Sequence, residues 1–154
     1  MDSDLLLKLC EAARTGVDLP DLRQQLTSGA ASARLVAAWF DDGSSVGLLA
    51  RRPKGAKGQD KDEIDVALAG AAAQAGIKVF DPRLSTTYDG AGEPRRFGLE
   101  LWLGEDQDGE QRPLRIGGEA TGEATVVDGL RVQPFIARTA RGEGEGLYVL
   151  AQSK

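Results

Sequence analysis

The chain has 154 residues and a formal net charge of −5 at pH 7, which is the size of one domain and an acidic balance that excludes a general nucleic-acid-binding surface. Its sequence contains no histidine and one cysteine, Cys10. A histidine-based catalytic triad, a histidine-bearing zinc site and an intramolecular disulfide are therefore excluded.

The N-terminal residues MDSDLLLKLCEAAR begin acidic rather than basic, and Lys8 interrupts their apolar stretch. This pattern predicts neither a signal peptide nor a membrane span, so we expect a cytoplasmic protein. We expect a single domain over residues 1–154, with a helical segment at 3–27 and a β-rich core at 33–152. Neither a cofactor nor a metal site is expected.

Residues 3–15 predict a helix, with Ser3 as its N-cap and Gly16 as its end. Cys10 lies on the apolar stripe of this helix, and we interpret it as a buried apolar side chain because no histidine is present to lower its pKa. A second short helix is expected to begin just before Pro20. The stripe of the first helix comprises Leu5, Leu6, Leu9, Cys10, Ala12 and Ala13.

A β-hairpin is predicted by two apolar runs, residues 33–40 and 46–53. The intervening DDGSS contains an Asp-Gly pair, which is a strong hairpin signal, and its length indicates a bulged turn.

The basic segment RRPKGAKGQDK, residues 51–61, follows this hairpin. A phosphate-binding loop needs Gly-Lys followed by a hydroxyl residue, whereas Gly55 and Gly58 are followed here by Ala56 and Gln59. We favour a solvated loop, with contact to an anionic partner as the alternative. The side chains that would make this contact are Arg51, Arg52, Lys54 and Lys57.

Residues 61–76 are ambiguous, because their alanine content and Gly76 favour a helix while Ile64 and Val66 alternate as in a strand. We favour the helix, and the helix-or-strand question stays open for 62–75. The composition of residues 81–94 predicts a loop.

Four strand candidates follow, and in the first of them Phe97 and Leu99 share one face while Glu100 and Trp102 share the other. Bulky side chains on both faces are typical of a curved sheet or barrel, and Gly117 with Gly118 would permit a bend. The candidates are residues 95–104, 112–127, 130–139 and 146–152, and RGEGEG at 141–146 predicts a flexible hairpin loop.

Three glutamates on the predicted strands, Glu100, Glu119 and Glu123, are the candidates for acid or base chemistry. In a pocket, burial and like charge would raise the pKa of such a carboxyl group. The favoured alternative is a set of ion pairs with arginines facing water. Trp102 and Phe135 either line a ligand cavity or belong to the core, and we favour the core.

Residues 81–150 contain TTYDG, PLRIGGEATG and GEGEGLYVL, and this region resembles lipocalin-like proteins related to carotenoid 1,2-hydratases. RRPKGAKGQD is similar to short actinobacterial proteins of the same group. The resemblance implies a curled antiparallel sheet that holds a small apolar ligand. It does not imply hydratase activity, because the hydratases are built from two barrel halves and this chain has room for one.

The expected fold class is α+β and β-rich, with N-terminal helices packed on a strongly curved antiparallel sheet or half-barrel of about six strands. The alternative is a cone-shaped α+β domain resembling nuclear transport factor 2. In enzymes of that type an Asp acts with a Tyr, so a carboxylate with Tyr88 or Tyr148 would serve here.

The leading functional hypothesis is a non-enzymatic binding module for a small apolar molecule or a protein partner, including a second copy of the chain. Its expected ligand-lining residues are Glu100, Trp102, Glu119 and Phe135. The alternative is a cofactor-free isomerase, hydratase or cyclase that uses a buried carboxylate. Nucleic acid and membrane are not expected as partners.

Overall fold

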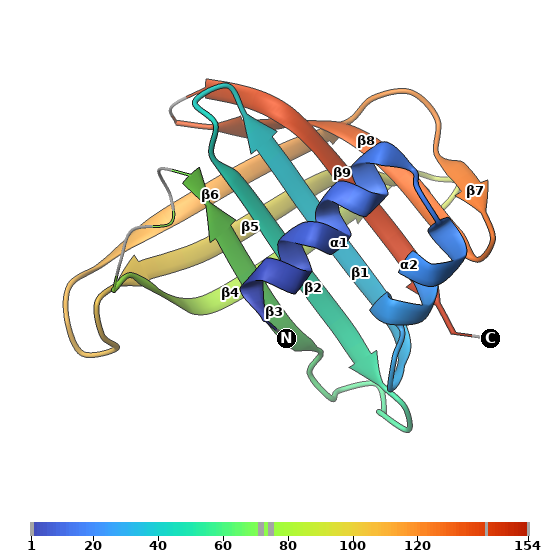
Figure 1. Cartoon of the computed structure of the whole chain (residues 1–154), viewed down its shortest axis with the longest axis horizontal. Helices are drawn as coiled ribbons and strands as arrows, with labels where there is room; N and C mark the ends of the chain where they lie inside the picture. Colours follow the sequence, from blue (N-terminus) through green and yellow to red (C-terminus); the bar gives the residue numbers. More distant parts are fainter. Residues whose placement is uncertain (1, 71–72, 74–75, 141, 154) are drawn as a thin grey trace.

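The computed structural model describes residues 2–70, 73, 76–140 and 142–153. Within these ranges the chain forms two helices followed by a sheet of nine antiparallel strands (Figure 1). The helices are α1 (Ser3–Thr15) and α2 (Leu19–Leu26). The strands are β1 (Ala30–Phe40), β2 (Ser45–Pro53), β3 (Glu63–Ala69), β4 (Lys78–Tyr88), β5 (Pro94–Gly104), β6 (Gln111–Ala120), β7 (Thr125–Val127), β8 (Leu130–Thr139) and β9 (Gly142–Gln152).

The sheet curls on itself into a nearly closed barrel. Its strand order is β3-β2-β1-β9-β8-β6-β5-β4, with β7 paired to β8. The two ends of this order, β3 and β4, approach each other without becoming hydrogen-bonded neighbours. We call the gap between them the seam. The expected β-rich α+β class, with N-terminal helices on a strongly curved antiparallel sheet, is confirmed.

The two helices begin and end where their capping residues dictate. The side chain of Asp2 accepts a hydrogen bond from the backbone N–H of Asp4 at 2.8 Å, so Asp2 rather than Ser3 is the N-cap of α1. Gly16 ends this helix in the left-handed conformation, at φ 72°. Asp18 caps α2. Both predicted helices are confirmed, with the N-cap of the first shifted by one residue.

The strand β1 is buried on both faces, because the helices cover the outside of the barrel over β1, β2 and β9 (Figure 1). Leu35 and Ala37 point outward to the helices, whereas Val36 and Ala38 point into the barrel. This double burial accounts for the unbroken apolar run of the strand. The outer core includes Leu6, Leu9, Cys10, Leu22, Leu26, Leu49 and Val149, and the inner core includes Leu48, Phe97, Leu99, Leu101, Ile116, Phe135 and Tyr148.

Three aromatic rings form the centre of the inner core. The Phe97 ring lies 4.8 Å, centroid to centroid, from both Phe135 and Tyr148. The Phe135 ring covers Gly118 of β6 and Gly146 of β9 so closely that added Cβ atoms would lie 2.5 Å and 2.2 Å from ring carbons. Glycine is therefore required at both positions by the space that the ring occupies.

The segment 63–69 is the strand β3, so the favoured helix is wrong there, and 71–72 and 74–75 lie outside the described residues. In β3, Val66 pairs with Leu48 of β2 and faces the barrel interior. Burial against β2 outweighs the helix propensity of the alanines.

Two predicted loops are also strands. Residues 81–88 belong to β4, where a register irregularity between Phe80 and Arg83 accommodates Pro82. Residues 142–146 belong to β9, because their glycines fit beneath Phe135 and beside β1. The predicted strand 112–127 divides into β6 and β7, and the hairpin 33–53 is confirmed. The sheet thus has nine strands rather than about six.

Candidate ligand-binding cavity

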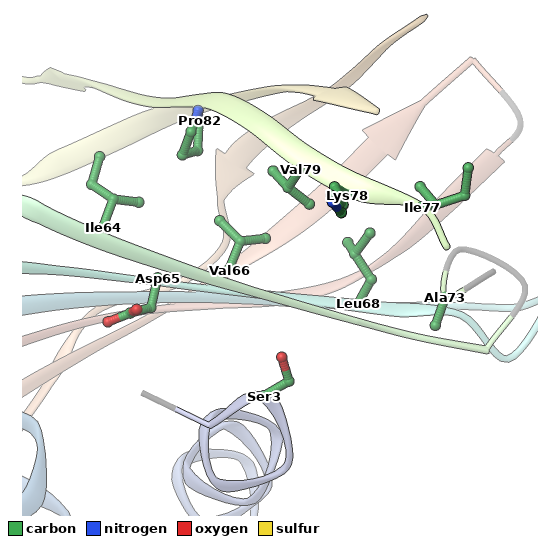
Figure 2. A pocket seen from close by; sticks show the side chains of 10 residues that line it. All are labelled: Ser3, Ile64, Asp65, Val66, Leu68, Ala73, Ile77, Lys78, Val79 and Pro82. Atoms are coloured by element: carbon green, nitrogen blue, oxygen red, sulfur yellow. The ribbon is translucent and has the colours of Figure 1, made fainter. Parts of the chain in front are cut away.

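A cavity of about 520 Å³ opens at the seam between β3 and β4 (Figure 2). Seven of the ten described residues that line it are apolar, and Ser3, Asp65 and Lys78 add polar groups. The lining residues are Ser3, Ile64, Asp65, Val66, Leu68, Ala73, Ile77, Lys78, Val79 and Pro82.

The β3 wall owes its apolar character to strand alternation. Ile64, Val66 and Leu68 rise toward β4, whereas Asp65 lies on the side that faces α1 (Figure 2). Asp65 is held there by Arg51, with an Nη2–Oδ2 distance of 3.5 Å. The carboxylate of this strand is therefore turned away from the aliphatic side of the cavity.

The β4 wall is built around the register irregularity near its start. Asp81 adopts a positive φ of 50°, and Pro82 follows it. Proline has no backbone N–H, so it presents an apolar ring beside Val79 without an unpaired donor. The seam thus has aliphatic side chains on both sides.

A cluster of interacting polar residues, which we call the polar end, lies at one end of the barrel: Arg34, Arg52, Asp62 and Tyr148, with the exposed Tyr88 at its rim. Arg34 donates from Nη2 to Oδ2 of Asp62 at 2.9 Å, and Arg52 donates from Nη1 to the other oxygen, Oδ1, at 3.4 Å. Asp62 therefore bridges β1 and β2 just before β3 begins.

The Tyr148 hydroxyl completes the polar end through interactions with Tyr88 and Arg34. Burial raises the pKa of Tyr148 to about 12, the neighbouring Tyr88 adds to the rise, and the Arg34 guanidinium opposes it. The Tyr148 hydroxyl consequently keeps its proton at neutral pH and remains a hydrogen-bond donor.

Strand register places the polar end level with the Ile64 end of the cavity, two strands away from it, and its five residues lie outside the cavity lining. Ile64 pairs with Ala50, Ala50 pairs with Arg34, and Arg34 pairs with Leu150 across adjacent strands. Ile64, Ala50 and Leu150 belong to the inner core, and Arg34 shares the inward face of β1 with Val36. The cavity residue Ile64 is therefore level with Arg34.

Two further polar features lie near this end. Arg131 of β8, also paired with Leu150, donates to Glu93 with an Nη1–Oε1 distance of 2.6 Å. Thr86 of β4 pairs with Phe97, and its buried hydroxyl has no hydrogen-bond partner in the described part of the chain. A buried hydroxyl without a partner is uncommon and indicates a place where a ligand or water binds.

The structure does not bring the four expected ligand-lining residues together. Phe135 lies in the inner core, whereas Glu100 and Trp102 lie on the outer face of β5, opposite to inward-facing Leu99 and Leu101. Glu100 and Trp102 line instead a shallow outer depression near Gln111.

Of the three expected acid or base residues, two are paired with arginine, and all three are accessible to solvent. The Glu100 side chain is 35% exposed and accepts a hydrogen bond from Arg115 Nε at 2.9 Å. The Glu119 side chain is 58% exposed and accepts from Arg138 at 3.2 Å, and Glu123 is exposed. These are the water-facing ion pairs that the sequence favoured.

The basic segment comprises the last three residues of β2 and most of the loop between β2 and β3. Arg52 donates to the backbone carbonyl oxygens of Lys57 and Asp60, in addition to Asp62, and Arg51 pairs with Asp65. Arg52 therefore organises the loop and Arg51 links β2 to β3, while Lys54 and Lys57 are exposed. Contact of the two lysines with an anionic partner stays a prediction.

Sequence reasoning missed Arg34, Asp62 and Thr86 as members of a site. Strand alternation could have identified Arg34, because it lies two residues before Val36 and therefore on the same inward face of a mostly apolar strand. A charged residue on such a face needs a partner inside the fold.

No helix in the described ranges is both long enough and apolar enough to cross a membrane. No protein-family model matches the chain, and no curated protein matches its sequence. The function is therefore inferred from the geometry and chemistry of the cavity.

Proposed function

We propose that this protein is a binding module for a small apolar molecule, which lies in the cavity at the seam between β3 and β4. The observation that carries the proposal is the aliphatic cavity of about 520 Å³ beside an open seam. This volume lies within the range of about 300–1,000 Å³ that is typical of small-ligand sites. We also propose, as part of this function, that the resemblance of residues 81–150 to lipocalin-like proteins reflects a similar mode of ligand binding.

Two aspects of the cavity support this function. Burial of apolar ligand surface contributes roughly 25 cal/mol per Å², so aliphatic walls on both sides would supply most of the affinity. The alternative, an enzyme with a buried carboxylate, has less support because Glu100 and Glu119 form solvent-accessible ion pairs. The more buried Asp62 is paired with both Arg34 and Arg52.

The test is a titration of the purified protein with the neutral apolar dye N-phenyl-1-naphthylamine, followed by fluorescence. The variant Val66→Trp places a large ring in the cavity, and we expect it to weaken dye binding by about tenfold or more. The matched control is Val126→Trp, which adds the same ring at an exposed position of β7.

Binding of the dye to Val126→Trp should equal that of the unchanged protein. Thermal melting of both variants verifies that they are folded. Equal binding to folded Val66→Trp, or no binding to the unchanged protein, would contradict the proposed function.

A further inference from the structure

We propose that the ligand is a single-chain anionic amphiphile with a carboxylate head group, which Arg34 and Tyr148 bind at the polar end while its apolar chain lies along Ile64, Val66 and Leu68. This inference rests on the proposed function and names the chemical class of the ligand.

The polar end carries an excess of positive charge. The two guanidinium groups of Arg34 and Arg52 share the single carboxylate of Asp62, which leaves one positive charge in excess. The adjoining ion pair between Arg131 and Glu93 adds no net charge. One excess positive charge matches a ligand that carries one negative charge.

The charged side chains of the polar end are partly buried. The side chains of Arg34, Arg52 and Asp62 are only 29%, 27% and 19% exposed. An uncompensated charge in such surroundings is costly because it has lost much of its hydration. An anion from the ligand would restore the charge balance in these partly buried surroundings.

The polar end also has more hydrogen-bond donors than acceptors. A guanidinium carries five N–H donors, whereas Arg34 donates one hydrogen bond to Asp62 and interacts with the Tyr148 hydroxyl. The Tyr148 hydroxyl lies beside Arg34, and the Thr86 hydroxyl has no partner in the described part of the chain. Donors therefore exceed acceptors, and a carboxylate offers only acceptors.

The apolar side chains of β3 extend in the direction that a ligand chain starting at Arg34 would take. Ile64 lies at the cavity end that is level with Arg34, and Val66 and Leu68 follow along the same face of β3 (Figure 2). A chain extending from Arg34 along this face would remain in contact with aliphatic side chains. Lys78 lines the same cavity elsewhere and is the competing position for the head group.

The experiment compares dodecanoate with 1-dodecanol by isothermal titration calorimetry at about pH 8, where the acid is ionised. Both probes have the same chain, so the difference in their affinities isolates the head group. We expect dodecanoate to bind about tenfold or more tightly than the alcohol, because charge-assisted hydrogen bonds are stronger than neutral ones.

Three variants locate the head group. Arg34→Gln should weaken dodecanoate binding by about tenfold and leave dodecanol binding unchanged. Asp62→Asn removes the competing carboxylate and should strengthen dodecanoate binding, which provides a second test if Arg34→Gln does not fold. The matched control is Lys8→Gln at an exposed position of α1, which should leave both affinities unchanged, whereas Lys78→Gln tests the competing position and should keep the preference for dodecanoate.

Equal binding of both probes to the unchanged protein would overturn the inference, as would a preference for dodecanoate that survives in folded Arg34→Gln or is lost in Lys78→Gln. In those outcomes the proposed function stands, provided that Val66→Trp weakens both probes. If neither probe binds the unchanged protein, both proposals fail.

Discussion

Phe135 of β8 lies directly against Gly146 of β9, and a Cβ atom added to Gly146 would lie 2.2 Å from the ring. The ring is held on its other sides by Gly118 and by Phe97, whose centroid is 4.8 Å away. It therefore has no free space into which it can move.

Gly146→Ala should lower the free energy of unfolding by roughly 1–3 kcal/mol, because the added methyl group overpacks the inner core. Urea unfolding measures this change. The control is Gly117→Ala on β6, where an added Cβ meets nothing within 4 Å. If the two variants were equally stable, the packing of Phe135 described above would be incorrect.

Cys10 makes stability depend on pH in the alkaline range. Burial raises the pKa of its thiol from 9.0 to about 12 in the folded protein. The unfolded chain thus releases this proton at lower pH than the folded chain does, so the stabilisation is complete below about pH 9 and is lost progressively as pH rises toward 12.

Cys10→Ala removes this contribution, so its unfolding free energy should fall less steeply between about pH 9 and 11, by up to about 1.4 kcal/mol per pH unit. Tyr148 and the lysines are common to both proteins and cancel in the comparison. Parallel pH profiles would refute the assignment of the slope to Cys10.

The Tyr148 hydroxyl and the Tyr148 ring should contribute separately. Tyr148→Phe removes the interactions with Tyr88 and Arg34 but keeps the stack on Phe97, and should cost about 0.5–1.5 kcal/mol of stability. Tyr148→Ala removes the ring as well and should cost about 3–5 kcal/mol. Chemical denaturation of both variants tests the order, and equal losses would contradict it.

Arg52 should control the order of the loop between β2 and β3, since it donates to the carbonyl groups of Lys57 and Asp60. In Arg52→Ala these bonds are lost, and we expect amide hydrogen exchange in residues 54–62 to accelerate severalfold. Lys54→Ala, at an exposed position of the same loop, should leave exchange unchanged. Unaltered exchange in both variants would show that Arg52 does not organise the loop.

The sequence predicted the strands with strong local signals. The hairpin β1–β2 follows from two apolar runs around an Asp-Gly turn, and β5 follows from its alternation. Alternation along β5 separates Leu99 from Glu100, but it does not reveal which face points inward. That choice depends on pairing with β4 and β6, which are distant interactions.

Of the two strands that form the cavity, β3 was the less favoured of two open alternatives, and most of β4 was predicted as a loop. Each is hydrogen-bonded to a neighbour along one side only, so packing imposes a weaker apolar pattern on it. This weaker apolar pattern is visible in β4 as the polar run Ser85–Thr86–Thr87 and in β3 as the alanines after Ile64. The candidate site is therefore the part of the fold that local sequence patterns describe least well.

The seam joins strands that are consecutive in the chain, since only residues 70–77 separate β3 from β4. Short connections make hairpin pairing the least costly contact in chain entropy. Apart from β6 and β7, which both pair with β8, every other two consecutive strands of the described sheet are hydrogen-bonded to each other, whereas β3 and β4 are not. The stabilisation that pairing of β3 with β4 would provide is therefore absent from the fold. A molecule that contacts both strands from inside the barrel would supply part of this stabilisation when it binds.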